Sequence, residues 1–164
     1  MCGIAGLMSL DQSMPRKKIL NNLVSKLRHR GPDGFGIHLS QDTGMIHRRL
    51  AVIDLKTGQQ PLSSKGLSLV ANAEIYNYLE LSEIFKKEKF KTKSDCECIL
   101  HLYNAYGLNF TKFLRGMYAL AIHDLEKNLL VLARDPFGIK PLYYLESSEY
   151  FSFSSEPRAL IDSG

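Results

Sequence analysis

Residues 117–135, MYALAIHDLEKNLLVLARD, decide the fold class of this chain. Two apolar segments of strand length, MYALAIHD and NLLVLARD, follow each other with only a brief connection between them. The pattern continues with PLYYLE at 141–146 and YFSFSS at 150–155. Consecutive short strands joined by brief connections predict antiparallel pairing.

The part of the chain before these strands contains both helical and extended patterns. Apolar runs predict strands at 3–8, 44–55 and 67–71, and the polar segment 56–66 predicts a loop. Helical spacing of apolar residues predicts helices at 15–29, 78–88 and 95–106. Ser94 followed by Glu97 predicts a capping box at the start of the last helix. Because the helices are segregated from the run of strands, the predicted class is α+β.

Composition indicates one ordinary globular domain. The chain has 164 residues, of which 45% are hydrophobic and 23% charged, as expected for a single soluble domain. No apolar run reaches the roughly 18 residues that a membrane-spanning helix needs, and the amino terminus does not resemble a signal peptide. We therefore expect a cytoplasmic protein with no membrane partner. The three cysteines cannot form a disulfide framework, and a lone C-x-C lacks zinc-ligand spacing, so we expect no metal site.

The charge of the chain gives little support to a nucleic-acid-binding function. The formal net charge is +4 and the isoelectric point is near 8.9. However, the lysines and arginines are dispersed, and no aromatic stacking motif accompanies them. A solvated basic surface is the better interpretation, and we expect no nucleic-acid partner.

The amino terminus, MCGIAGLM at residues 1–8, places a cysteine directly after the initiator methionine. Cys2 is small enough for Met1 to be removed, and the thiol and the free α-amine would then belong to one residue. Such a residue combines a nucleophile with a base whose reference pKa is about 8. Alternatively, Cys2 is an ordinary small hydrophobic residue at the start of a strand. These eight residues alone leave both interpretations open.

Several further stretches are polar or rich in glycine where folding alone does not require it. Together with MCGIAG they occur in a characteristic order: RHRGPDGFG at 28–36, HRRLAVIDL at 47–55, NAEIYN at 72–77, SDCE at 94–97, ARDPFGIKPLYY at 133–144 and FSSEPRAL at 153–160. In this order the chain resembles the glutamine amidotransferase domain of asparagine synthetases, which belongs to the class II, N-terminal nucleophile hydrolase type. The proline in RGPDG resembles the residue that the asparagine synthetase branch of this class has at that position. The resemblance covers the chain from Met1 to about Leu160.

The resemblance implies a fold and a domain organisation. It implies a four-layer αββα sandwich, in which two stacked antiparallel sheets are covered by helices on both outer surfaces. Residues 1–164 would form a single type 2 amidotransferase domain, and the synthetase domain of the family is absent from this chain. Glutamine and a synthetase domain or subunit are the implied partners. No cofactor is expected in this domain, because ATP and magnesium would bind only in the synthetase domain.

The resemblance also implies the roles of particular residues. Cys2 would attack the glutamine amide, while the Asn72 side chain and the backbone N–H of Ala73 would form the oxyanion hole. The implied substrate-binding residues are Arg49 for the carboxylate, and Glu74 with Asp95 for the ammonium group.

The RGPDG segment would shape the mouth of the pocket through four residues: Arg30, Gly31, Asp33 and Gly34. Gly31 and Gly34 are expected to permit the turn, and Arg30 to be held by an internal acid. The histidines His29 and His47 are expected to be structural.

Position 73 departs from the family pattern, which usually has glycine there. An alanine held at a positive φ would be strained by about 1 kcal/mol.

The function that the resemblance implies is hydrolysis of glutamine to glutamate and ammonia, with ammonia passed on for asparagine synthesis from aspartate and ATP. The alternatives are a catalytically weak or silent glutamine-binding relative, or an amidotransferase for another acceptor.

Overall fold

The computed structural model describes residues 1–11, 13, 15, 17–52, 54 and 56–161. Within these ranges the chain forms two antiparallel sheets. The first sheet has the order β2-β3-β1-β9-β8, with β1 at Gly3–Ser9, β2 at Gly34–Ser40, β3 at Thr43–Arg49, β8 at Tyr143–Glu146 and β9 at Tyr150–Ser154. The second sheet has the order β4-β5-β6-β7, with β4 at Leu62–Ser64, β5 at Leu67–Ile75, β6 at Gly116–Asp124 and β7 at Leu129–Arg134.

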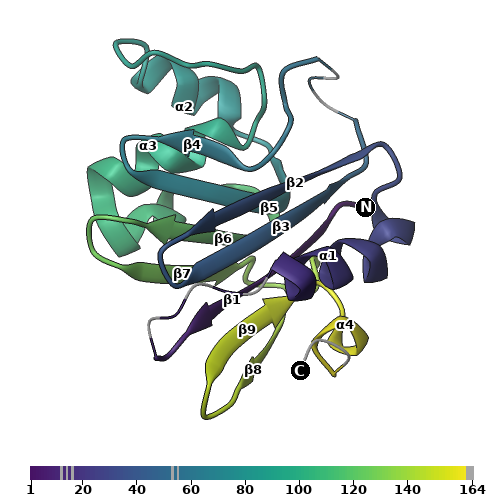
Figure 1. The fold of residues 1–164 in the computed structure, drawn as a ribbon. Coiled ribbons are helices and arrows are strands. Elements are labelled where there is room, and N and C mark those ends of the chain that lie inside the picture. Colours follow the sequence, from purple (N-terminus) through teal and green to yellow (C-terminus); the bar gives the residue numbers. More distant parts are fainter. Residues whose placement is uncertain (12, 14, 16, 53, 55, 162–164) are drawn as a thin grey trace.

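The two sheets stack face to face, and helices cover their outer surfaces (Figure 1). The first sheet is covered by α1 (Lys17–Lys26) and α4 (Pro157–Ile161), and the second by α2 (Tyr78–Ile84) and α3 (Glu97–Tyr106). Two short 3₁₀ helices lie at Arg28–Arg30 and Gly107–Phe113. This arrangement confirms the αββα sandwich implied by the resemblance.

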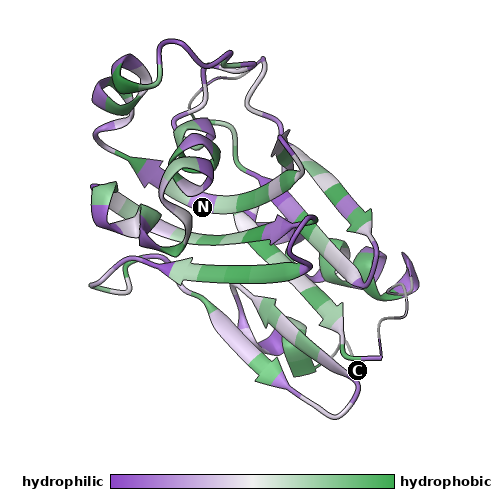
Figure 2. Ribbon diagram, turned by 90° about the vertical axis from the view of Figure 1, so that its left-hand side faces the viewer, coloured by the Kyte–Doolittle hydropathy of each residue, from purple (hydrophilic) through white to green (hydrophobic). Residues whose placement is uncertain are grey.

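Strand alternation explains why the chain has three apolar layers. Side chains at alternate positions of a strand point to opposite faces of the sheet. On β1, Ile4 packs between the two sheets, whereas Ala5 packs beneath α1. On β5, Val70 faces the first sheet, and its neighbour Leu69 packs beneath α3. The central strands are accordingly largely hydrophobic, while the connecting loops are hydrophilic (Figure 2).

The structure confirms the four predicted C-terminal strands and the three predicted helices, with shorter helix boundaries. The predicted strand at 44–55 ends at Arg49, and its residues 53 and 55 lie outside the described ranges. It ends there because Asp33, instead of a neighbouring strand, bonds the next backbone groups: its N–H donates to Arg49 O and its carboxylate accepts the Ala51 N–H. Strands β2 and β4 were not predicted, because their sequences are rich in glycine or serine.

Among the helices of the described ranges, none is both long and apolar enough to cross a lipid bilayer.

Candidate active site

A cavity of about 260 Å³ lies at one end of the space between the two sheets. Its volume is just below the range of about 300–1,000 Å³ that is usual for drug-sized ligands, so it suits a small metabolite. Met1 and Val52 form an exposed part of its lining, whereas His47 and Asn72 are deeply buried and form its floor. The six residues that the sequence predicts as catalytic or substrate-binding all line this cavity: Cys2, Arg49, Asn72, Ala73, Glu74 and Asp95.

Strand alternation brings these residues together from distant parts of the sequence. The positions that pack between the sheets are Ile4 on β1, Met45 on β3 and Val70 on β5. Residues two or four places away on the same strand faces point the same way. By this rule the side chains that face the space between the sheets are Cys2, His47, Arg49, Asn72 and Glu74.

The thiol of Cys2 lies against the backbone of Leu50. The Leu50 N–H donates to Cys2 Sγ at 3.4 Å, and the Leu50 carbonyl oxygen lies 3.5 Å from the same sulfur. Met1 also lines the cavity, where Lys140 Nζ lies 4.0 Å from Met1 Sδ. Removal of Met1 would therefore enlarge the cavity next to the sulfur and place the α-amine of Cys2 there.

On the side of β5 opposite β6, the short strand β4 pairs only with residues 67–69. Further along this edge, side chains bond to the backbone of β5 in place of a neighbouring strand. Gln60 Oε1 accepts the Ala71 N–H at 2.6 Å, and Asp95 Oδ2 accepts the Ile75 N–H at 2.8 Å. Alternate N–H groups along a strand point to the same edge. The N–H of Ala73 therefore points into the gap between these two bonds, at the cavity.

Ala73 itself has an ordinary extended conformation. It lies within β5 opposite Tyr118 and is not among the described residues with positive φ. An alanine is therefore not strained at this position, and the N–H donor that a glycine would supply is retained.

Asn72 presents a second donor to the cavity. The residue is only 3% exposed, and its Nδ2 atom has no hydrogen-bond partner in the part of the chain that the structure describes. Buried polar atoms without partners are uncommon and occur at functional sites. The Asn72 amide and the Ala73 N–H thus form a pair of donors suited to a negatively charged oxygen.

Arg49 is one of two cationic residues that line the cavity, and Lys140 is the other. Its guanidinium group donates to the carbonyl oxygen of Asp54. The carboxylate of Asp54 in turn accepts the Lys93 N–H at 2.9 Å. Asp54 therefore connects Arg49 to the segment that leads into Asp95.

Two acids line the cavity together. Burial raises the pKa of the Asp95 carboxyl, and the negative charge of Glu74 acts in the same direction. A cation bound between the two carboxylates would relieve this unfavourable interaction. Arg49 and these two carboxylates therefore offer one cationic and two anionic groups for a zwitterionic ligand.

The four residues predicted to shape the pocket mouth, Arg30, Gly31, Asp33 and Gly34, do not line the cavity. Two of them hold the residues that do. Arg30 Nε donates to the carbonyl oxygen of Cys2 at 3.0 Å, and Arg30 Nη1 donates to Glu156 at 3.1 Å. Asp33 fixes the backbone on both sides of Leu50 through the two bonds that end β3.

The two glycines differ in what they require. Neither has a left-handed φ. A Cβ atom on Gly31 would lie 2.4 Å from the carbonyl carbon of Arg48, so Gly31 permits a close backbone approach. A Cβ atom on Gly34 would meet nothing closer than 3.5 Å. Both glycines were expected to permit the turn, and the structure shows a close approach that requires glycine only at Gly31.

The cavity also contains polar residues that the sequence did not indicate as site residues: His47, Gln60, Ser94 and Lys140. His47 is 1% exposed, and in the described ranges both of its ring nitrogens lack a well-formed hydrogen bond. Burial lowers the pKa of His47 to about 4, and the charge of Arg49 contributes to this shift. Its position two residues before Arg49 on a strand was the signal that could have placed it in the cavity.

The family model that matches this chain describes a glutamine amidotransferase domain, over residues 1–164. The chain is 42% identical to asparagine synthetase [glutamine-hydrolyzing] 2 of Bacillus subtilis, covering 98% of this chain and 22% of that protein. It is 44% identical to asparagine synthetase [glutamine-hydrolyzing] 2 of Oryza sativa, covering 99% and 28% respectively. The chain thus spans less than a third of the length of these relatives.

Solved structures support the fold. The glutamine phosphoribosylpyrophosphate amidotransferase of B. subtilis, complexed with ADP and GMP, superposes with a TM-score of 0.79 at 23% identity. The match covers 99% of this chain and 44% of that one. Together with the cavity and the match over the whole sequence, these findings show that the chain belongs to the glutamine amidotransferase domain family.

Proposed function

We propose that this domain hydrolyses the side-chain amide of glutamine to glutamate and ammonia, with Cys2 as the nucleophile. One observation carries the proposal: a single cavity is lined by a thiol, the Asn72 amide whose Nδ2 has no partner within the described residues, the backbone of Ala73, one arginine and two acids. A thiol and an oxyanion hole serve acyl transfer. An arginine with two acids serves recognition of a free amino acid.

The proposed reaction begins after removal of Met1. The Cys2 thiol passes its proton to its own α-amine, directly or through water, and the sulfur attacks the amide carbon. The oxygen becomes negatively charged and is stabilised by Asn72 Nδ2 and the Ala73 N–H. The C–N bond then breaks, the amine returns the proton to the leaving nitrogen, and ammonia departs from a thioester.

Water completes the cycle. It attacks the thioester carbon and gives a proton to the α-amine, and the C–S bond breaks. The proton returns to the sulfur, and glutamate leaves. No redox or phosphate chemistry is needed in this half-reaction, so we expect ATP and magnesium to act only in a synthetase domain.

We assign substrate recognition to the charged residues of the cavity. Arg49 would bind the carboxylate of glutamine, and Asp95 with Glu74 would bind its ammonium group. A carboxylate that accepts a backbone N–H, as Asp95 does, is held in a fixed position. The same three charges would favour glutamine over simple amides.

We further propose that the ammonia is used by a synthetase domain or subunit that makes asparagine from aspartate and ATP. The support is that the relatives are named as glutamine-hydrolyzing asparagine synthetases and are more than three times as long as this chain. A cytoplasmic location suits this role, because reducing conditions there keep a catalytic thiol free. The ordinary φ of Ala73 removes the main argument for a silent glutamine-binding relative.

The decisive experiment measures glutamate release from glutamine by the wild-type chain and by Cys2→Ala. We expect turnover only in the wild type. Intact mass should show loss of Met1, and a glutamine-like chloroketone should add once to the wild type and not to Cys2→Ala, which keeps Cys96 and Cys98. Equal glutamate release by both chains would refute the proposal.

A further inference from the structure

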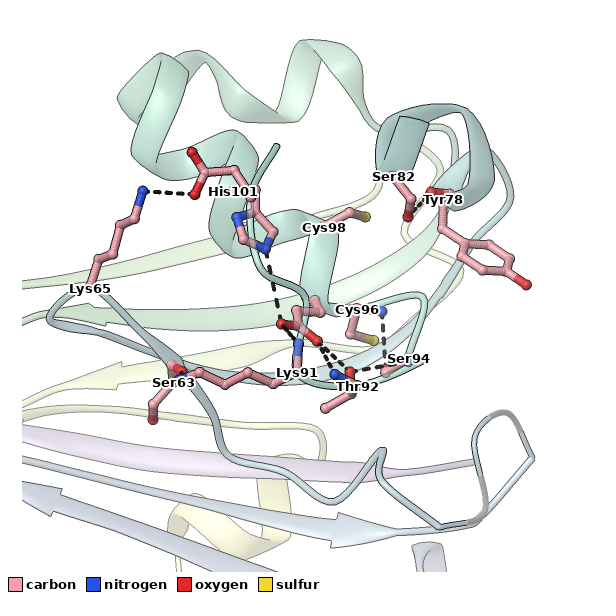
Figure 3. A network of polar contacts seen from close by, with 12 residues as sticks. Ser63, Lys65, Tyr78, Ser82, Lys91, Thr92, Ser94, Cys96, Cys98 and His101 are labelled. Carbon is pink, nitrogen blue, oxygen red and sulfur yellow. Dashed lines mark hydrogen bonds and ion pairs between the residues drawn. The ribbon is translucent and has the colours of Figure 1, made fainter. Parts of the chain in front are cut away.

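Glu97, at the start of α3, has a buried carboxylate that binds the backbone of the preceding segment. It is 3% exposed. Its Oε1 atom accepts the Lys91 N–H at 2.7 Å, and its Oε2 atom accepts the N–H and the hydroxyl of Thr92 at 2.7 and 2.6 Å. His101 Nε2 lies 4.0 Å from the same carboxylate (Figure 3).

This arrangement differs from the predicted capping box. In a capping box Glu97 would bind the N–H of Ser94. Instead, the Ser94 N–H donates to Thr92 Oγ1 at 3.1 Å, and the carboxylate reaches further back along the chain. Glu97 therefore fixes the segment 91–94 and not only the helix end.

The bonds continue from Glu97 to both sides of Asp95. Thr92 Oγ1 donates to Glu97 and accepts the Ser94 N–H, and Ser94 Oγ accepts the Cys96 N–H at 3.2 Å (Figure 3). Asp95 lies between the last two residues of this series. Its own carboxylate lines the cavity and is bonded to the Ile75 N–H.

Within the described residues, the Glu97 carboxylate bonds to neither the sulfur of Cys2 nor the two proposed oxyanion-hole donors. Glu97 is not part of the cavity lining. A disturbance of its carboxylate would therefore be transmitted to the segment 94–96, which lines the cavity and whose one charged residue is Asp95. Charge-assisted bonds such as these three are stronger than neutral ones, so their loss would matter for that position.

We propose that Glu97 is a positioning residue for recognition of the substrate's α-ammonium group, acting through Asp95. The inference rests on the proposed function for the identity of the ligand. Glu97 contacts neither the substrate nor the reacting atoms. Its role is selective: it sets the affinity for ligands that carry an α-ammonium and leaves ligands without one unaffected.

The test compares glutamine with the same molecule lacking its α-amino group, 4-carbamoylbutanoate. Dissociation constants for both are measured by calorimetry in the non-hydrolysing Cys2→Ala background, with and without Glu97→Gln. Glutamine should bind about tenfold or more weakly after Glu97→Gln. The affinity for 4-carbamoylbutanoate should stay unchanged.

Two further variants complete the test: one is a control for charge, and the other breaks the same network at a different residue. Glu88→Gln removes a nearby acid that pairs with Lys65 at 2.9 Å, and it should change neither affinity. Thr92→Val deletes the hydroxyl between Glu97 and Ser94 while keeping the side-chain shape, and it should weaken glutamine binding in the same selective way. Thermal unfolding of each variant shows whether the fold is retained.

The outcomes separate this inference from the proposed function. Equal weakening of both ligands by Glu97→Gln and Thr92→Val, or no weakening of either, overturns the positioning role. Selective weakening supports it, even if the wild-type chain proves unable to hydrolyse glutamine, which would refute only the proposed reaction.

Discussion

Arg30 donates a hydrogen bond from Nε to the carbonyl oxygen of Cys2 at 3.0 Å, and so holds the residue that carries the proposed nucleophile. The same guanidinium donates from Nη1 to Glu156 at 3.1 Å. His29 also contacts Glu156, at 2.8 Å. Arg30, the first residue of the RGPDG segment, therefore does not line the cavity but holds in place the backbone of Cys2, which does.

Replacement of Arg30 by lysine is expected to lower kcat/KM for glutamine by about tenfold or more. A lysine ammonium cannot make both directed bonds of the planar guanidinium. Steady-state glutamate release checks this, with Glu156→Gln as the matched variant that keeps the bond to Cys2 and should lose less activity. A larger loss in Glu156→Gln than in Arg30→Lys would show that the bond to Cys2 is unimportant.

Gly31→Ala should lower the free energy of unfolding, whereas Gly34→Ala should change it little. A methyl group added at position 31 would overlap the backbone between β3 residues 48 and 49, and such overpacking costs about 1–3 kcal/mol. A methyl group added at position 34 has room, so its effect should stay within about 0.5 kcal/mol. Chemical denaturation of both variants measures this, and equal destabilisation would contradict the close approach seen at Gly31.

The fold could be predicted from the sequence where apolar segments of strand length are separated by turn residues. The four C-terminal strands satisfy this condition, and each was found. Strand β2 was missed because its apolar residues Phe35 and Ile37 are exposed, and because the positions that alternate with them are glycine, histidine and serine. The stacking of the two sheets followed from the family resemblance, because periodicity within a segment does not show which sheet it joins.

The site could be predicted only in part. The family motifs indicated all six residues that line the cavity in the predicted catalytic and binding set. They did not indicate His47 as a cavity residue, although its position two residues before Arg49 on the same strand face could have placed it there. Nor did they show that Gln60 and Asp95 occupy the open edge of β5, since that edge is created by the short length of β4.

Ala73→Gly is expected to leave kcat and KM for glutamine unchanged and to lower stability. Because Ala73 has an extended conformation, glycine offers no relief of strain. Glycine in a strand costs about 0.5–1 kcal/mol through its greater freedom in the unfolded chain. Steady-state kinetics and denaturation midpoints check both parts. A strong gain in kcat would instead show that the Ala73 N–H is poorly placed in the native chain.

The stability of the domain should fall as the pH decreases from about 6.5 to about 4. Burial lowers the pKa of both His38 and His47 from 6.5 to about 4. In this window the unfolded chain binds protons that the folded chain does not, so the free energy of unfolding decreases with falling pH. For the fully buried His47 the loss amounts to at most about 3 kcal/mol.

Denaturation at pH 7.5, 6 and 5 measures this dependence. His47→Gln and His38→Gln should each flatten it. A pH dependence that is identical in the wild type and both variants would show that neither histidine is responsible.

Asn72→Ala should reduce kcat by about 100–1,000-fold, the usual cost of removing one oxyanion donor, while the KM for glutamine changes little. The Nδ2 atom has no partner within the described residues, so its removal breaks no hydrogen bond of the folded chain that involves this atom. Thermal unfolding should accordingly show a much smaller effect than the kinetics do. Asn72→Asp is the sharper variant, because it keeps the shape, loses the donor and adds a negative charge facing the developing oxyanion. It should be at least as inactive as Asn72→Ala, and near-normal turnover by Asn72→Asp would exclude this amide from the oxyanion hole.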